Sequence, residues 1–179
     1  SQDIDGLYAD ILNLVINKSG LQVDFVKEEW SELLNNFKNK KLDLLPATFY
    51  SKDREKYGFF SDPYYHVREY IYTQQNNTDI TSLDDLKNKT IAIVKDYATI
   101  KKLKNKYPNI DIVQTANLTQ SVTMLLNNQV DALIDYHLAV DTYIRDNSIV
   151  KLKSIAQSEL KAISVHYLSH IEKPILHSI

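Results

Sequence analysis

The sequence predicts an α/β fold built as two lobes, with the chain crossing between them twice. Helix-like and strand-like patterns alternate along most of the 179 residues, which is typical of a sheet flanked by helices. A polar stretch at residues 74–78 and a strand-like segment at residues 161–167 are the expected crossings. A hydrophobic content of 44% is enough for one sizeable core or two smaller ones.

The first lobe is expected to begin with an amphipathic helix. Apolar residues recur at helical spacing after Gly6, and this helix should end before Gly20. Residues 23–25 alternate in the manner of a strand, and residues 29–40 again show helical spacing. The apolar run at residues 42–45 follows that second helix, so we expect a buried parallel strand there.

The second lobe continues the alternation of strands and helices. Strands are predicted at residues 69–73, 90–94, 110–113 and 130–134. Helices are predicted at residues 82–86, 98–107 and 138–144, with another after the capping-box pattern at residues 117–120. The strand at residues 161–167 then returns to the first lobe, and a short helix at residues 172–178 follows it.

A loop next to the strand at residues 42–45 is the first candidate binding region. Pro46 has no N–H to donate, so we expect it to end the strand. Thr48, Tyr50 and Ser51 would then lie just beyond the carboxyl end of a strand, where open α/β sheets bind ligands.

Arg54 follows this loop and is the candidate anion-binding residue. Its planar guanidinium can hold a carboxylate through two parallel hydrogen bonds, which Lys cannot do. The alternative is a surface ion pair with one of three neighbouring acids, Asp53, Glu55 or Asp62.

Several spaced motifs resemble one family. Asp43, Arg54 and the turn Phe60-Ser61-Asp62-Pro63-Tyr64 stand where periplasmic solute-binding proteins of the polar amino-acid type have a strand Asp, a loop Arg and a Phe-Ser-x-Pro-Tyr turn. The resemblance covers nearly the whole chain. It implies the type 2, family 3 periplasmic-binding fold, a Venus flytrap with two hinge crossings. Residues 1–73 and 165–179 would form lobe 1, without the family's first strand, and residues 74–164 would form lobe 2.

The resemblance also implies roles for residues in both lobes. Arg54 would grip the α-carboxylate of a bound amino acid. Asp135 follows the predicted strand at residues 130–134 and matches an acid that binds the α-amino group in this family. The spacing from Asp131 to this acid is one residue shorter here than in many transport members of the family, so Tyr136 is an alternative occupant of that position. A third possibility is that Asp135 caps the next helix.

Two aromatic residues are further candidates. Trp30 matches a position where many members pack an aromatic ring on the ligand, although it also shares a helix face with Leu33 and Leu34 and fits a core role. Tyr97 lies in Asp96-Tyr97-Ala98, before a predicted helix N-terminus where the family has Gly-Thr-Thr. An acid at position 96 is expected to repel a second anionic group.

The function that follows is binding of a small polar solute, an amino acid or a similar carboxylate. The chain resembles the sensor modules of membrane receptors such as histidine kinases. The alternatives are a free binding protein of an amino-acid ABC transporter and an enzyme on the same fold, such as a dehydratase or a lytic enzyme. No catalytic motif is visible, because His166 and His170 lie four apart in a strand-like segment and not in a zinc-protease motif. We expect a membrane-embedded partner and no cofactor or metal.

The composition also limits which other classes of protein this chain can belong to. A net charge of −2 gives no reason to expect nucleic-acid binding. The chain contains no cysteine, so it has no disulfide or thiolate metal site. No apolar run approaches the roughly 20 residues that span a bilayer. The chain opens almost inside a helix without a signal peptide, as expected of an excised or processed fragment, and its family predicts an extracytoplasmic, bacterial location.

Overall fold

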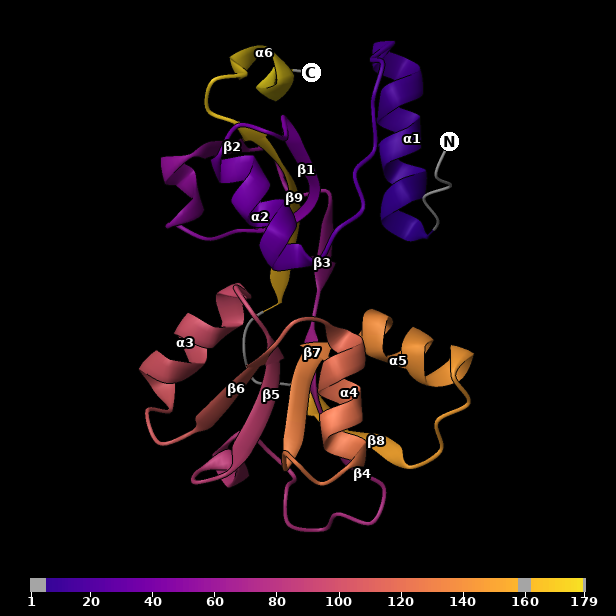
Figure 1. Cartoon of the computed structure of the whole chain (residues 1–179), viewed down its shortest axis with the longest axis vertical. Helices are drawn as coiled ribbons and strands as arrows, with labels where there is room; N and C mark the ends of the chain where they lie inside the picture. Colours follow the sequence, from indigo (N-terminus) through magenta and orange to yellow (C-terminus); the bar gives the residue numbers. More distant parts are fainter. Residues whose placement is uncertain (1–5, 158–161, 179) are drawn as a thin grey trace. The chain divides into compact units, whose positions relative to one another are not determined.

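The computed structural model describes residues 6–157 and 162–178. The chain divides into two compact units, of which the first contains Ser1–Tyr65 and Ser164–Ile179 and the second contains His66–Ile163. The chain therefore passes between the units twice, after residue 65 and after residue 163. Figure 1 shows the elements of both units in sequence colours.

The first unit contains a small sheet organised around its last strand. The order is β1-β9-β2, and β3 also pairs with β9. The strands are β1 (Leu44–Phe49), β2 (Gly58–Phe60), β3 (Tyr65–Val67) and β9 (Ile163–His170). The helices are α1 (Leu7–Ser19), α2 (Trp30–Lys38), the short 3-10 turn η1 (Arg54–Lys56) and α6 (Pro174–His177).

The core of this unit joins α2 to the sheet. Leu34 and Phe37 of α2 pack with Leu45 of β1 and Leu168 of β9, and all four are buried. The ring of Phe37 also meets the ring of His170 edge-on, at 5.3 Å between centroids. Burial of the apolar face of α2 is therefore what holds this short helix on the sheet.

Three expectations for the first unit are wrong. Residues 21–29 form no strand, although their alternation predicts one. β1 is not a parallel strand, because it pairs antiparallel with β9, which comes from the far end of the chain. Pro46 does not end β1 either, since the register shifts between Leu45 and Thr48. A bulge of this kind accommodates a residue that has no N–H for the ladder.

The second unit is a five-stranded sheet with the order β6-β5-β7-β4-β8. β5 is parallel to β6 and β7, whereas β4 is antiparallel to β7 and β8. The strands are β4 (Glu69–Gln74), β5 (Thr90–Val94), β6 (Asp111–Thr115), β7 (Ala132–Tyr136) and β8 (Leu152–Gln157). The helices are η2 (Asp84–Leu86), α3 (Ala98–Lys106), α4 (Leu118–Leu126) and α5 (His137–Asp146).

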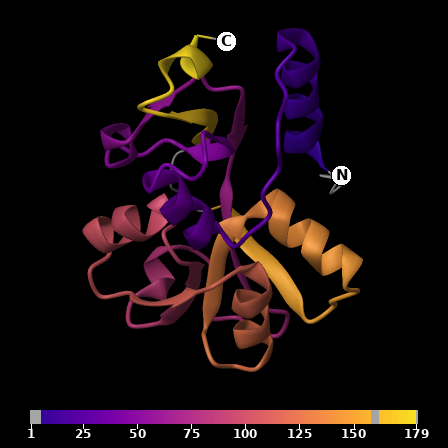
Figure 2. The same cartoon turned by 45° about the horizontal axis from the view of Figure 1, so that its top comes forward.

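Helices cover both faces of this sheet. Leu103 of α3 packs in one buried cluster with Ile71 and Ile134 of the sheet. The other face carries a second cluster that contains Tyr72 and Leu133, together with α4 and α5. Figure 2 shows the same helices and strands from a second direction. This is the three-layer arrangement that alternating strands and helices predict.

The first crossing lies earlier than the predicted boundary after residue 73. That boundary falls inside β4, which pairs with β7 from its first residue, Glu69, through Tyr72. The backbone hydrogen bonds of this strand are therefore made in the second unit. For the return strand, β9 begins at Ile163, and Lys161 lies outside the described residues.

Most predicted elements of the second unit are confirmed. β5 occupies the predicted residues, and α3 begins at the predicted Ala98. The capping-box prediction is confirmed as well, because Asn117 Oδ1 accepts a hydrogen bond from Gln120 N at 2.9 Å, while Gln120 Oε1 accepts one from Ala116 N at 2.6 Å.

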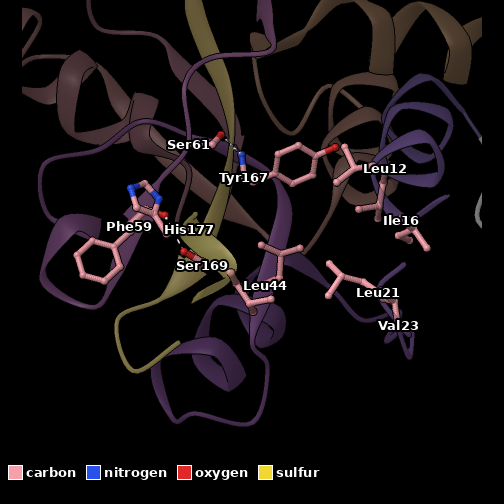
Figure 3. A pocket seen from close by; sticks show the side chains of 12 residues that line it. Leu12, Ile16, Leu21, Val23, Leu44, Phe59, Ser61, Tyr167, Ser169 and His177 are labelled. Atoms are coloured by element: carbon pink, nitrogen blue, oxygen red, sulfur yellow. Dashed lines mark hydrogen bonds between the residues drawn. The ribbon is translucent and has the colours of Figure 1, made fainter. Parts of the chain in front are cut away.

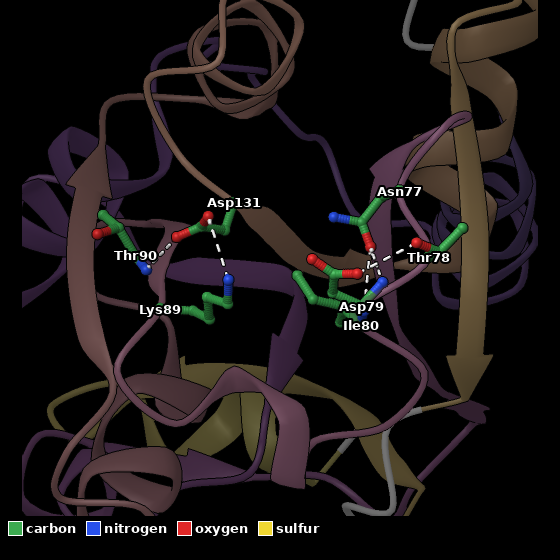
Figure 4. Close-up of polar contacts among 7 residues, drawn as sticks. All are labelled: Asn77, Thr78, Asp79, Ile80, Lys89, Thr90 and Asp131. Carbon is green, nitrogen blue, oxygen red and sulfur yellow. Dashed lines mark hydrogen bonds and ion pairs between the residues drawn. The ribbon is translucent and has the colours of Figure 1, made fainter.

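Side chains also fix the end of the second unit where β5 and β7 begin (Figure 4). Asp131 Oδ2 accepts a hydrogen bond from Thr90 N at 2.8 Å, and its other oxygen lies 4.0 Å from Lys89 Nζ. Asn77 Oδ1 accepts hydrogen bonds from the backbone N–H groups of Asp79 and Ile80. Asp131 thus has a structural role at the strand end opposite to Asp135.

Candidate functional site

Arg54 is buried, with 4% of its surface exposed. Its Nη1 donates a hydrogen bond to the carbonyl of Phe49 at 2.8 Å. Its guanidinium lies over the Trp30 ring, with 5.0 Å between Cζ and the ring centroid. This arginine is therefore a buried residue and not an exposed surface one, and its guanidinium is held in place by an aromatic face and a backbone carbonyl.

Trp30 combines the two roles left open by the sequence. It is the first residue of α2 and packs against the buried cluster of Leu34 and Phe37. The Arg54 guanidinium lies over the same ring. Trp30 thus belongs to the edge of the core and orients the candidate anion-binding residue. Ligand contact by Trp30 stays a prediction.

The predicted loop begins later than expected. Thr48 lies within β1, is fully buried and donates a hydrogen bond to the Leu45 carbonyl at 3.5 Å. Tyr50 follows the strand, is 43% exposed and donates a hydrogen bond to Glu55 Oε1 at 2.7 Å. The carbonyl of Ser51 accepts a hydrogen bond from Arg54 N at 2.9 Å. Thr48 is therefore a strand residue, whereas Tyr50 and Ser51 belong to the turn that carries Arg54.

In the second unit, the register of β4 and β7 decides which side chains share a face. Glu69 pairs with Tyr136, and Tyr70 pairs with Asp135. Directly opposite residues of an antiparallel pair lie on the same face, and successive residues alternate. Glu69 and Tyr136 therefore belong to the face that α3 covers, whereas Asp135 belongs to the face of α4 and α5.

Glu69 is a candidate that the sequence reasoning missed. It is 2% exposed, and its carboxylate accepts a hydrogen bond from the hydroxyl of Thr99 in α3. Tyr97, the N-cap residue of α3, brings its ring to 5.4 Å from the ring of Tyr136. The sequence feature that could have identified it is an acid at the start of an otherwise apolar strand. Burying a charge at such a position is costly, so an acid there indicates a specific role.

Burial raises the pKa of Glu69 to about 7, against the opposing effects of the Thr99 hydrogen bond, the charge of Lys102 and the Tyr136 hydroxyl. Burial also raises the pKa of Asp135 to about 7, and the charge of Glu69 adds to this. Neither acid forms an ion pair within the part of the chain that the structure describes. The two carboxylates therefore compete for protons near neutral pH.

Asp135 lies inside β7 and not after it. The N-cap residue of α5 is Tyr136, so Asp135 is not the helix cap. Its Oδ1 instead accepts a hydrogen bond from Tyr136 N at 2.7 Å, and this hydrogen bond lowers its pKa. Tyr136 is itself buried, with 6% exposed.

Asp96 adopts a left-handed backbone conformation, with a φ of 63°. This is the conformation that favours glycine, and Asp is one of the few other residues that adopt it readily. Asp96 is exposed, so its charge faces solvent directly before the α3 N-terminus.

A pocket of about 90 Å³ lies in the first unit, apart from the predicted site residues (Figure 3). It is mainly apolar, and α1 contributes Leu12 and Ile16 to it while β1 contributes Leu44. Neither Arg54 nor Trp30 lines it. The chemistry of this pocket is therefore unrelated to the carboxylate binding expected of Arg54.

The two histidines of β9 have structural contacts. His166 hydrogen-bonds through its ring nitrogens to the Ser61 carbonyl at 2.6 Å and to the Ser164 hydroxyl at 2.7 Å. His170 packs on Phe37. Within residues 6–157 and 162–178, no three His, Cys, Asp or Glu side chains gather closely enough to hold a metal ion. None of the helices in these ranges has the length and apolar character that crossing a membrane requires.

Two α/β units joined by two chain crossings define the class as a two-lobed protein with the Venus flytrap fold. Comparison with known families agrees, because residues 1–110 match the family model of bacterial extracellular solute-binding proteins, family 3. The chain belongs to this family. The expected extracytoplasmic, bacterial setting is thereby confirmed.

Relatives in this family include both sensors and free binding proteins. The chain is 26% identical over 160 residues to the virulence sensor protein BvgS of Bordetella pertussis, a match that covers 89% of this chain and 13% of BvgS. It is 27% identical over 150 residues to the L-cystine-binding protein TcyA of Bacillus subtilis, covering 84% of this chain and 55% of TcyA. The chain thus spans only part of the length of these relatives.

Solved structures show the same fold. The periplasmic VFT2 domain of Bordetella pertussis BvgS aligns with 99% of this chain and 76% of that domain, with a TM-score of 0.88 and 24% identity. The holo form of ArgBP from T. maritima aligns with 98% of this chain and 77% of that protein, with a TM-score of 0.86 and 20% identity. The relatives compared are thus a sensor protein, its periplasmic domain and binding proteins.

Proposed function

We propose that this domain binds a small polar solute, an amino acid or a similar carboxylate, in the cleft between its two lobes. Arg54 would hold the carboxylate, since its guanidinium is already fixed by the Trp30 ring and the Phe49 carbonyl. A preformed fork loses little side-chain entropy on binding. Tyr50 and Ser51 lie on the turn beside Arg54 and would add polar contacts.

The proposed biological role is that of a ligand sensor domain in a transmembrane signalling protein, such as a histidine kinase. One observation carries this inference: the similarity to the sensor protein BvgS covers 89% of this chain. Ligand binding would be reported by closure of the lobes about the two crossings. The partner would then be the membrane-embedded part of the same receptor.

A free solute-binding protein of an amino-acid ABC transporter is the second candidate. The similarity to TcyA and to a probable amino-acid ABC transporter-binding protein of Haemophilus influenzae favours it. The coding sequence on either side of this segment distinguishes the two roles. A membrane span followed by a kinase supports a sensor, whereas a secretion signal beside a permease gene supports transport.

Native mass spectrometry of the purified protein tests the binding function directly. We expect a co-purified small molecule that carries a carboxylate, and calorimetric titration should then show that the same compound binds the stripped protein. A compound without a carboxylate, or no binding by any amino acid, would contradict the proposal. We also propose no catalytic role, and the released compound should therefore remain chemically unchanged after prolonged incubation with the protein.

A further inference from the structure

The Glu69 carboxylate is buried, and it forms no ion pair with a cation of the described residues. It is 2% exposed, and the Thr99 hydroxyl donates a hydrogen bond to its Oε1. Its other oxygen, Oε2, is buried and accepts no hydrogen bond of standard geometry from the residues that the structure describes. A carboxylate oxygen in this state is costly to keep charged unless a donor reaches it.

Aromatic side chains border the same carboxylate. Tyr136 is its direct partner across β4 and β7, and the ring of Tyr97 lies 5.4 Å from the ring of Tyr136. A carboxylate beside aromatic faces is the combination that recognises ammonium and guanidinium groups. A metal ion fits this position less well, because the described residues offer no cluster of three ligating side chains.

We propose that Glu69 binds a positively charged nitrogen group of the ligand, an ammonium or a guanidinium, and thereby selects organic cations over uncharged and anionic solutes. This inference rests on the proposed function, because it requires a small ligand that reaches the second unit. It transfers to Glu69 the amine-binding role predicted for Asp135, whose side chain belongs to the opposite face of the sheet.

The charges around Glu69 act in opposite directions on a cation at this position. The positive charge of Lys102 in α3 and the Tyr136 hydroxyl already stabilise the carboxylate and lower its pKa, and Lys102 repels a second cation, whereas the negative charge of Asp135 attracts one. Glu69 in turn raises the pKa of Asp135 and of Tyr97. A ligand cation at Glu69 relieves these repulsions and displaces a proton from the carboxyl group.

Calorimetric titration at pH 8 with four probes tests the assignment: L-arginine, L-glutamine, putrescine and succinate. Wild-type protein should bind at least one of the three nitrogen-bearing probes, and Glu69→Gln should weaken that binding by about 30-fold or more. Asp111→Asn is the matched control, because it removes the same charge from an exposed position of the second unit, and its affinity should be unchanged.

The outcomes separate this inference from the proposed function. If an amino acid binds wild type and Glu69→Gln equally well, the Glu69 assignment fails and the proposed function stands. If putrescine alone binds and Glu69→Gln abolishes this, the Glu69 assignment stands and amino-acid binding fails. Succinate as the sole bound probe, or no bound probe at the highest soluble concentration, overturns the assignment.

The pH dependence provides a readout that a purely structural role would not affect. Binding of the cationic probe should be about tenfold tighter at pH 8 than at pH 6, because the Glu69 carboxyl must lose its proton. Glu69→Gln should lose most of this dependence, and Glu69→Asp should retain part of it. Circular dichroism verifies that both variants are folded. A dependence that survives in Glu69→Gln would assign the titration to Asp135 and overturn the role of Glu69.

Discussion

The guanidinium of Arg54 stacks on the indole ring of Trp30, with 5.0 Å between Cζ and the ring centroid. The two residues come from η1 and α2, and the Phe49 carbonyl holds the other side of the arginine through Nη1. This contact links the candidate carboxylate site to the edge of the core. Arg54 therefore contributes to folding as well as to binding.

The first prediction concerns Arg54→Lys. Binding of a carboxylate ligand should weaken by about 2–5 kcal/mol, because Lys lacks the bidentate fork. Stability should also fall by about 1–2 kcal/mol, since a buried arginine loses its stacking and its hydrogen bond to a carbonyl. Calorimetry and urea unfolding measure the two losses separately.

Lys52→Ala is the control for this experiment, because Lys52 is an exposed residue of the same turn. Its effect on stability should stay within about 0.5 kcal/mol. If Arg54→Lys has the same urea unfolding midpoint as the wild-type protein, the contact with Trp30 contributes nothing to stability.

The second prediction is that the ligand-free protein loses stability as the pH rises from about 4.5 to about 7. The pKa of Glu69 in the folded protein is about 7, against an ordinary value of 4.5. The folded state therefore holds a proton that the unfolded state has already lost in this range. Below about pH 4.5 both states are protonated, and above about pH 7 the full cost is present, about 3 kcal/mol for this one group.

Glu69→Gln should flatten this pH dependence, since glutamine carries no proton to lose. Asp135→Asn should flatten the remainder, because the pKa of Asp135 is raised to about 7 in the same way. Urea unfolding at a series of pH values provides the measurement. If the stability of the wild-type protein instead rises over this pH range, burial does not raise the pKa values of Glu69 and Asp135 in solution.

The third prediction is a smaller radius of gyration in the presence of a saturating ligand. It follows from the proposed closure, in which a ligand held by Arg54 of the first unit also contacts side chains of the second. Small-angle scattering with and without the compound identified by mass spectrometry provides the comparison. An unchanged radius on binding would contradict closure, and the Arg54→Lys protein at the same ligand concentration is the control.

Local patterns predicted the second unit well. The apolar run at residues 90–94 became β5, and Asn117 became an N-cap, because each depends on interactions within a few residues. The first unit was predicted less well. β1 depends on β9, a strand far away in sequence, and the bulge at Pro46 is visible only once that pairing is known.

The candidate site was also hard to predict where it depends on contacts between residues that are distant in the sequence. Arg54 was found through a motif, but its burial depends on Trp30 from a different helix. Glu69 was missed because its partner Thr99 lies 30 residues away, and because the face it shares with Tyr136 is decided by the register of β4 and β7. Sequence spacing near Asp135 alone could not determine which acid faces α3.

The last prediction concerns Gly58, which pairs with His170 where β2 meets β9. A Cβ at this position would lie 2.8 Å from Leu168 Cδ1 and 2.8 Å from the Ser169 carbonyl oxygen. The leucine can rotate, but the carbonyl belongs to the strand backbone. Gly58→Ala should therefore push β2 away from β9 and cost about 1–3 kcal/mol in urea unfolding.

Two further variants identify the cause of this loss. Gly20 adopts a left-handed conformation with open space around it, and asparagine tolerates this conformation, so Gly20→Asn should stay within about 0.5 kcal/mol of wild type. Leu168→Val removes part of the side-chain contact and leaves the carbonyl in place. In a double-mutant cycle, Leu168→Val should therefore fail to rescue Gly58→Ala. Full rescue would show that the leucine, and not the backbone of β9, requires glycine at this position.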